Sequence, residues 1–447
     1  MIRRIKKIFE SEEKKTLLSN FISLSFLRGV TYLLPLITLP YLVRILGPEK
    51  YGLIAFILAF AQYFKYLTAY GFDLSATKEI SINRNDREKI SEIYSSVLTV
   101  KLLLTIISFI IYAIVVFSFN RFRQEWIICF LTYGIVLGDA IFPVWLFLGL
   151  ERMKYITGLN IVSKIVFTVA IFVFIREDSD YYLVPLFNSL GFIIAGVLSL
   201  WLTKRDFDIE YKIPSILSIK ACLIDGWHIF LAKAFGGLYL SSITFILGLL
   251  TNNTIVGYYS AAERIITAVR GFIGPVSQTV YPHISKVVNL SKEKGVQFIR
   301  KVLLLVGILT FILSVVLLVF SKQIVNVILG PEYYNSIIVI QILSFLPFIT
   351  GLSNIFGIQA MLNFDLERQY SRIVILTAII SILMTIILSS PMKQAGAALT
   401  VLIAESFILV ATFLSLQTNG IMLLGARKRN SIEMRDSNKT SERDIEN

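Results

Sequence analysis

The chain has 447 residues, of which 55% are hydrophobic and only 16% charged, and its mean hydropathy is +0.73. Soluble domains carry about a quarter charged residues, so this composition excludes an ordinary soluble fold and indicates a membrane protein. The net charge of +13 is compatible with nucleic acid or with an anionic membrane surface, and the positions of the charges decide between the two.

Apolar stretches long enough to cross a bilayer, about 20 residues each, recur along the whole chain. Twelve of them can be distinguished, at residues 17–43, 51–71, 93–118, 126–150, 157–175, 181–203, 227–250, 258–281, 302–321, 337–361, 373–390 and 396–417. Several contain prolines, which remove a helical hydrogen bond and should bend the helix. The sequence predicts an all-α polytopic membrane protein with about 12 transmembrane helices.

The basic residues are distributed unevenly across this topology. If the N-terminus is cytoplasmic, the inner segments hold 29 of the 43 lysines and arginines, and the outer segments hold seven. This asymmetry follows the positive-inside rule and predicts that both termini are cytoplasmic. Most of the net charge therefore reflects topology, and we expect no nucleic-acid partner.

The spans fall into two equal sets. Residues 17–203 and 227–417 hold six spans each, and we expect them to form two lobes joined by a cytoplasmic linker at 204–226. The charged N-terminal segment 1–16 has apolar residues at helical spacing and should lie on the inner leaflet as an amphipathic helix. The polar tail, 418–447, should be disordered.

Two short internal similarities accompany this division. Residues 51–55 (YGLIA) resemble residues 256–260 (VGYYS), and both open the second span of their half, as an internal duplication would require. The sharper match, ILGPE at 45–49 and 328–332, has the wrong spacing for that duplication. A reused turn explains it more simply, because glycine ends a helix and proline prevents its continuation.

Basic residues inside the spans are the strongest functional signal. A cation at the bilayer centre costs about 2.5–3.5 kcal/mol on insertion scales, so such residues usually face the interior of the bundle or a wet cavity. The spans contain seven of them: Arg28, Lys65, Lys101, Lys164, Lys233, Arg264 and Arg270. A membrane protein lined with cations points to an anionic substrate.

These seven residues lie at different depths in the membrane. Arg28 and Arg270 lie near the middle of spans 1 and 8, so they are the first candidates to bind an anion. Arg264 lies nearer the outer end of span 8. The four lysines lie in the inner halves of their spans, where an alternative is that each extends its ammonium to the headgroups.

Acidic residues are fewer within the spans. Asp139 and Glu405 fall near mid-depth, where each could bind a coupling ion or merely neutralise a span cation. Glu263 most simply neutralises Arg264 or Arg270.

The motifs of soluble enzyme sites are missing from the sequence. It contains no HExxH, GxSxG, Walker A or CxxC pattern and only two histidines, so we expect no metal, no cofactor and no catalytic nucleophile. The predicted outer loops are short, which argues against a membrane-embedded polymerase that must hold an acceptor outside the membrane. We expect a transporter and not an enzyme.

Several longer stretches resemble one transporter family. They are YLLPLITLPYLVRILGPEKYG (32–52), YGFDLSATKEI (70–80), IFPVWLFLGLERMKY (141–155), DGWHIF (225–230), GPVSQTVYPHIS (274–285), GPEYYNS (330–336) and LPFITGLSNIFGIQAML (346–362). Together they are similar to the Wzx-type O-antigen flippases, in the polysaccharide-transporter branch of the multidrug/oligosaccharidyl-lipid/polysaccharide superfamily. They cover nearly the whole chain in order.

This resemblance implies a specific fold and function. It implies two six-helix lobes, arranged as in the multidrug (MATE) transporters of the superfamily, with a central cavity that is cationic. It also implies transfer of an undecaprenyl-pyrophosphate-linked oligosaccharide from the inner to the outer leaflet of the cytoplasmic membrane by alternating access. A polysaccharide polymerase and a chain-length regulator are then expected partners, beside the membrane lipids. A multidrug cation antiporter of the same superfamily is the main alternative, and a membrane-embedded polymerase is a weaker one.

Overall fold

The computed structural model describes the backbone of residues 12–271 and 273–423, and the side chains of these residues except 12–33, 228, 232–240, 275–276 and 279. Across this described part, every regular element is a helix. The chain is therefore all-α, as predicted. The segments 1–11 and 424–447, which hold most of the predicted amphipathic helix and polar tail, lie outside the described residues.

In the first half of the chain, the described residues form eight α-helices and one short 3-10 helix. They are α2 (Glu12–Ala69), α3 (Phe72–Ile82), α4 (Arg87–Ser118), α5 (Asn120–Arg123), α6 (Trp126–Ile141), α7 (Val144–Gly149), α8 (Met153–Phe174), η1 (Asp178–Tyr182) and α9 (Leu183–Phe207).

The second half begins with long helices, continues with several short ones and ends with the long helix α17. They are α10 (Ile216–Leu250), α11 (Asn253–Arg270), α12 (Ile273–Leu290), α13 (Lys292–Val319), α14 (Ser321–Ile324), η2 (Val325–Leu329), η3 (Pro331–Ser336), α15 (Ile337–Leu343), α16 (Leu346–Asn354), η4 (Ile355–Ala360), η5 (Met361–Phe364) and α17 (Glu367–Thr418).

The predicted spans coincide with helical backbone. Eight stretches of the described chain are long and apolar enough to cross a membrane. Two helices, α2 and α17, each contain two predicted spans joined at a kink, which lies at Gly47 in α2 and at Lys393 in α17. The kink in α2 falls at the turn between spans, whereas its backbone stays helical through Pro35 and Pro40.

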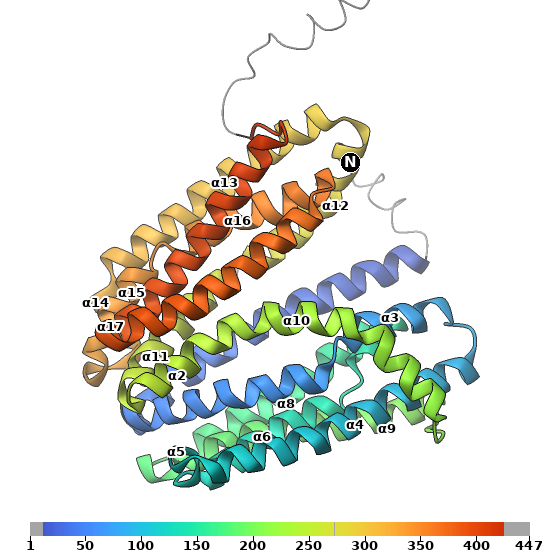
Figure 1. Cartoon of the computed structure of the whole chain (residues 1–447), viewed down its shortest axis with the longest axis horizontal. Helices are drawn as coiled ribbons and strands as arrows, with labels where there is room; N and C mark the ends of the chain where they lie inside the picture. The colour runs from blue at the N-terminus through green and yellow to red at the C-terminus, as the bar shows by residue number, and fades with distance from the viewer. Residues whose placement is uncertain (1–11, 272, 424–447) are drawn as a thin grey trace, which may run out of the picture.

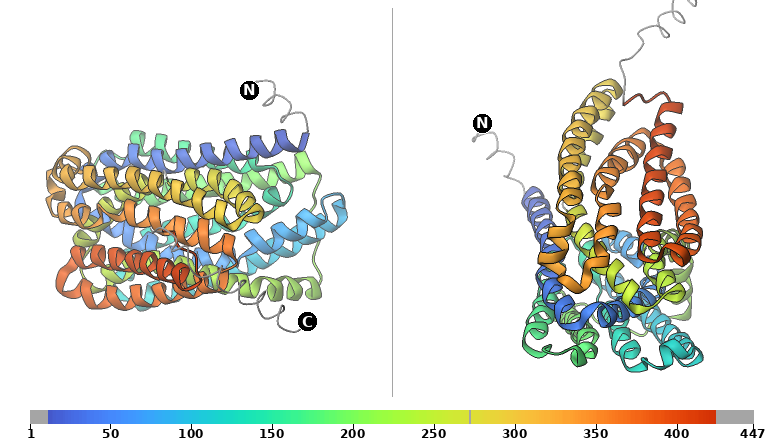
Figure 2. Two further views of the ribbon diagram at one scale, coloured as in Figure 1. Left: turned by 90° about the horizontal axis from the view of Figure 1, so that it is seen from above. Right: turned by 90° about the vertical axis from the view of Figure 1, so that its left-hand side faces the viewer.

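The helices pack in two groups that meet at one end. Helices α4, α6 and α8 pack against α2, and α9 packs against α6 and α8, while α12, α13, α15, α16 and α17 pack with one another. Helix α11 packs along α2, and α10 contacts both α2 and α17, so these two helices join the groups. The groups converge where α5 and α14 lie and separate toward the opposite end (Figures 1 and 2).

The two ILGPE segments form matching turns at the converging end. Gly47 (φ 64°, ψ 174°) and Gly330 (φ 95°, ψ 173°) adopt the same backbone conformation, which is essentially restricted to glycine. The turns also touch, because the guanidinium of Arg44 donates to the carbonyl of Val327. A Cβ added to Gly47 would lie 3.2 Å from Glu332 Oε2. The repeated motif is thus a repeated turn, and its two copies form part of the contact between the groups.

Candidate functional site

A cavity of about 560 Å³ lies between α2, α6, α8, α9, α10 and α11. Its lining follows the helical period, since the residues that α8 contributes are spaced three and four apart: Asn160, Ser163, Lys164, Phe167 and Thr168. Helix α11 contributes Ser260, Glu263 and Arg264 in the same way. Helices α8 and α11 therefore each present one face with polar side chains to the cavity.

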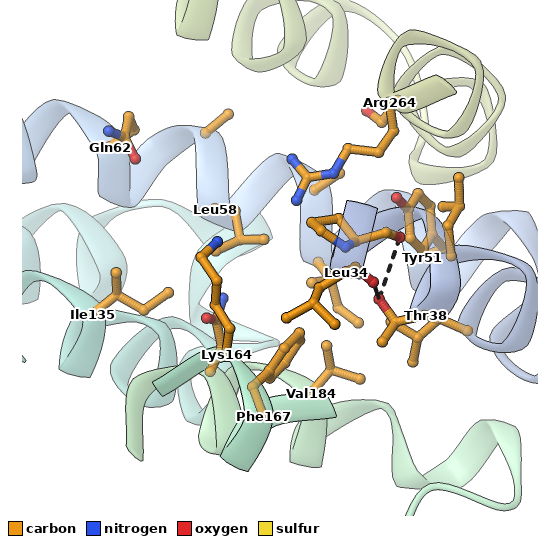
Figure 3. A pocket seen from close by; sticks show the side chains of 18 of the residues that line it. Leu34, Thr38, Tyr51, Leu58, Gln62, Ile135, Lys164, Phe167, Val184 and Arg264 are labelled. Atoms are coloured by element: carbon orange, nitrogen blue, oxygen red, sulfur yellow. Dashed lines mark hydrogen bonds between the residues drawn. The ribbon is translucent and has the colours of Figure 1, made fainter. Parts of the chain in front are cut away.

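Lys164 on α8 and Arg264 on α11 both project into this cavity (Figure 3). Helix α11 buries Ala261, Ala262 and Ile265, which leaves Arg264 on the exposed side of the helix. Within the described part of the chain, neither Lys164 nor Arg264 forms an ion pair or a side-chain hydrogen bond. Two cations that face one space and form no ion pair among the described residues create a positive field that a dense anion would neutralise.

Lys65, on α2, is a third cation at the cavity wall. Its Nζ lies 2.9 Å from Asp139 Oδ1 and 5.1 Å from the centre of the Phe192 ring. Lys101 lies next to this pair and is only 3% exposed, and its Nζ donates to the backbone oxygen of Asp139 at 3.0 Å. Asp139 thus neutralises a span cation, and the ammonium of Lys101 binds protein atoms inside the bundle.

The cavity also contains uncharged polar and aromatic side chains that sequence reasoning missed. They are the amides Gln62, Asn160 and Asn188 and the rings Tyr51, Tyr66, Phe167 and Phe192. Amides supply both donors and acceptors, and aromatic faces bind apolar ring surfaces, so this lining suits a hydroxylated cargo. For the two on α8, Asn160 and Phe167, the available signal was their helical spacing from Lys164.

The remaining described candidates lie as follows. Arg270 Nη2 is 2.9 Å from Glu405 Oε1 of α17, Glu405 is 6% exposed, and neither residue lines the cavity. Glu263 does line the cavity, and it accepts a hydrogen bond of 2.5 Å from Thr267 Oγ1.

Two candidates cannot be placed at the level of side chains. Arg28 on α2 and Lys233 on α10 belong to helical backbone, but their side chains lie outside the described residues, so their roles stay predictions. Among the described residues, no three His, Cys, Asp or Glu side chains come together in a way that could hold a metal ion.

Comparison with known sequences gives consistent results. Residues 17–288 match the family described as "Polysaccharide biosynthesis protein". A protein of Escherichia coli (strain K12) is 32% identical over 410 residues, covering 92% of this chain and 99% of that relative. A protein of Shigella dysenteriae is 27% identical over 394 residues, covering 88% and 98%. Both carry the name "Putative O-antigen transporter".

Solved structures agree on the fold. The lipid II flippase MurJ, in an inward closed conformation, superposes with a TM-score of 0.69 at 14% identity, covering 90% of this chain and 87% of that one. An inward-facing MATE-family multidrug resistance transporter gives 0.63 at 13% identity, covering 89% and 96%. The predicted MATE-like, all-α fold is thus confirmed, and the match to the family confirms the resemblance seen in the sequence. The chain belongs to the polysaccharide biosynthesis protein family and is a multi-pass membrane transporter.

Proposed function

We propose that this protein is a flippase that moves an undecaprenyl-pyrophosphate-linked oligosaccharide from the inner to the outer leaflet of the cytoplasmic membrane. The observation that carries the proposal is the pair Lys164 and Arg264, which face one cavity and form no ion pair with any described residue. A pyrophosphate is a dense anion, for which arginine offers paired donors and lysine a point charge. The name of the two sequence relatives, O-antigen transporter, supports a cargo of this class.

The lining of the cavity suggests which side chains contact each part of the cargo. Lys65, Lys164 and Arg264 would bind the phosphates, and the neighbouring amides and rings would contact the sugars. The prenyl chain would remain in the lipid, because a free energy of about 0.8 kcal/mol per CH₂ opposes its exposure to water.

The arrangement of the helix groups supports alternating access. The groups meet at one end and separate toward the other (Figure 1), so rocking about the contact would expose the cavity to each side in turn. If both termini are cytoplasmic, as the positive-inside rule predicts, the separated end faces the cytoplasm, where the cargo is made. The two predicted lobes would then be the moving bodies. A polymerase and a chain-length regulator would act on the delivered cargo.

A cation antiporter of the same fold is the competing function. The likeness to MATE transporters concerns the fold and leaves the cargo open. A cationic drug needs an acidic pocket, whereas the described side chains that line this cavity include three basic ones and one acidic one. Its charge therefore favours an anionic cargo.

Complementation tests the proposal. Lys164→Ala and Arg264→Ala, expressed in a strain without its own O-antigen flippase, should abolish surface polysaccharide at normal protein levels. The matched control is Arg176→Ala, because Arg176 is an exposed basic residue just beyond the end of α8. Wild-type polysaccharide from both cavity variants would contradict the proposal.

A further inference from the structure

Two lysines share one aspartate behind the cavity wall. Lys65 Nζ lies 2.9 Å from Asp139 Oδ1, and Lys101 Nζ donates to the backbone oxygen of the same residue at 3.0 Å. Within the described part of the chain, Lys101 has no carboxylate in ion-pair distance, so one carboxylate serves a cluster of two cations.

The cluster has an accessible side and a closed side. Lys65 lines the cavity, and the side chains of Lys65 and Asp139 are 25% and 24% exposed. Lys101 is only 3% exposed, and it does not line the cavity. An anion that enters the cavity therefore meets Lys65 first, and Lys65 is already bound to Asp139.

An anionic cargo must compete with Asp139 for this ammonium. A phosphate carries at least as much negative charge as a carboxylate and offers several acceptor oxygens. An ammonium has three donors in a compact head, so it can turn from one acceptor to another by rotating a few side-chain bonds. An ion pair that is one quarter exposed can exchange in this way because solvent screens it partly.

Lys101 is placed to receive the released carboxylate. Its bond goes to the backbone oxygen of Asp139, in the last turn of α6, which also accepts a hydrogen bond of 3.4 Å from the backbone N–H of Phe142. This bond stays in place when the side chain of Asp139 moves. The ammonium of Lys101 keeps two further donors, so it can bind the carboxylate without leaving its position.

We propose that Asp139 is a built-in counter-ion that occupies Lys65 in the empty cavity and passes to Lys101 when the phosphate of the cargo binds Lys65. The inference rests on the proposed function, since it assumes a pyrophosphate cargo. It makes Asp139 and Lys101 positioning residues that act through Lys65. The competition keeps binding reversible, because the returning carboxylate helps to release the cargo.

A set of binding measurements tests this exchange. The purified full-length protein in nanodiscs is titrated with undecaprenyl pyrophosphate, and transport is followed as surface polysaccharide. Asp139→Asn keeps the shape and the backbone oxygen but removes the competing charge. It should bind about threefold to fivefold more tightly than the wild type, the range expected for losing a partly exposed competing ion pair, and should transport more slowly. Asp139→Glu should restore the wild-type affinity.

Double variants separate this exchange from a structural role. The effect of Asp139→Asn should disappear in a Lys65→Met background. Lys101→Gln should weaken binding when it is introduced into the wild-type protein. It should have no further effect when it is combined with Asp139→Asn, because that variant releases no carboxylate that needs a partner. Equal or weaker binding by a folded Asp139→Asn variant, or the same gain without Lys65, would overturn the exchange and leave the proposed function intact. A wild-type protein that does not bind undecaprenyl pyrophosphate would overturn both.

Discussion

Gly52 and Gly257 form a reciprocal contact between α2 and α11. A Cβ on Gly52 would lie 1.8 Å from the backbone oxygen of Asn253, and one on Gly257 would lie 1.9 Å from that of Pro48. Each glycine thus faces the carbonyl four residues before the other. This relationship is what a local two-fold axis between α2 and α11 produces, and it brings the two backbones into direct contact.

Adding a methyl group at either glycine should disrupt this contact. The obstructing atoms are backbone, which cannot rotate away, so Gly52→Ala and Gly257→Ala should each lower the free energy of unfolding by about 1–3 kcal/mol. Thermal unfolding in detergent would show the loss as a lower midpoint. The control is Gly158→Ala on α8, where an added Cβ has no neighbour within 4 Å. Unchanged midpoints for both contact variants would contradict the close packing.

The ion pair between Arg270 and Glu405 should have a structural role. Glu405 is 6% exposed, so Arg270→Ala would leave a buried carboxylate without this partner and should cost about 3–5 kcal/mol of stability. Replacing both residues, by Arg270→Met with Glu405→Leu, should recover most of that loss in a thermal unfolding assay.

Arg264→Ala is the matched comparison for this pair, because Arg264 lies on the same helix and forms no ion pair within the described residues. It should reduce transport and leave the unfolding midpoint unchanged. If instead Arg270→Ala unfolds like the wild type while transport is lost, Arg270 has the binding role that its depth in the sequence predicts.

Arg121 should be more important than its neighbour Arg123. The guanidinium of Arg121 donates to the carbonyls of Gly248 and Thr251 and, at 2.8 Å, to Asn253 Oδ1. It therefore binds carbonyl groups at the end of α10 and a side chain at the start of α11 at the same time. Lysine cannot do this, because it lacks the planar guanidinium with its several N–H donors. Arg121→Lys should lower the unfolding free energy by about 1–2 kcal/mol.

Arg123→Lys is the control for this prediction. Arg123 is exposed, and among the described residues its side chain binds Asn120 of its own short helix alone, so its replacement should leave thermal unfolding unchanged. Equal midpoints for the two lysine variants would show that the Arg121 contacts do not stabilise the junction between α10 and α11.

The similarity between 51–55 and 256–260 acquires a physical meaning in the structure. It contains Gly52 and Gly257, and Lys65 and Arg270 each follow their glycine by thirteen residues. Both basic residues bind a carboxylate at 2.9 Å within the protein. Equivalent positions in the two halves therefore carry a basic residue that is bound to a carboxylate, although Asp139 lies in the fourth span of its half and Glu405 in the sixth span of the other.

The sequence by itself determined that this is an all-helical membrane protein and which basic residues lie within its spans. These conclusions follow from hydropathy, helix length and the cost of burying charge, which act along the chain and need no knowledge of packing. The repeated ILGPE turn was also predictable, because the glycine conformation and the following proline are local.

Only the tertiary structure decided which cations meet a cavity and which meet a carboxylate. Its depth in the membrane made Arg270 a stronger candidate than Arg264 to bind the anion. In the structure, however, Arg270 binds Glu405 and Arg264 faces the cavity. Two residues six positions apart on one helix point to different neighbours, and those neighbours come from distant parts of the chain. Depth fixes how costly a charge is, whereas the direction in which its helix faces fixes what neutralises it.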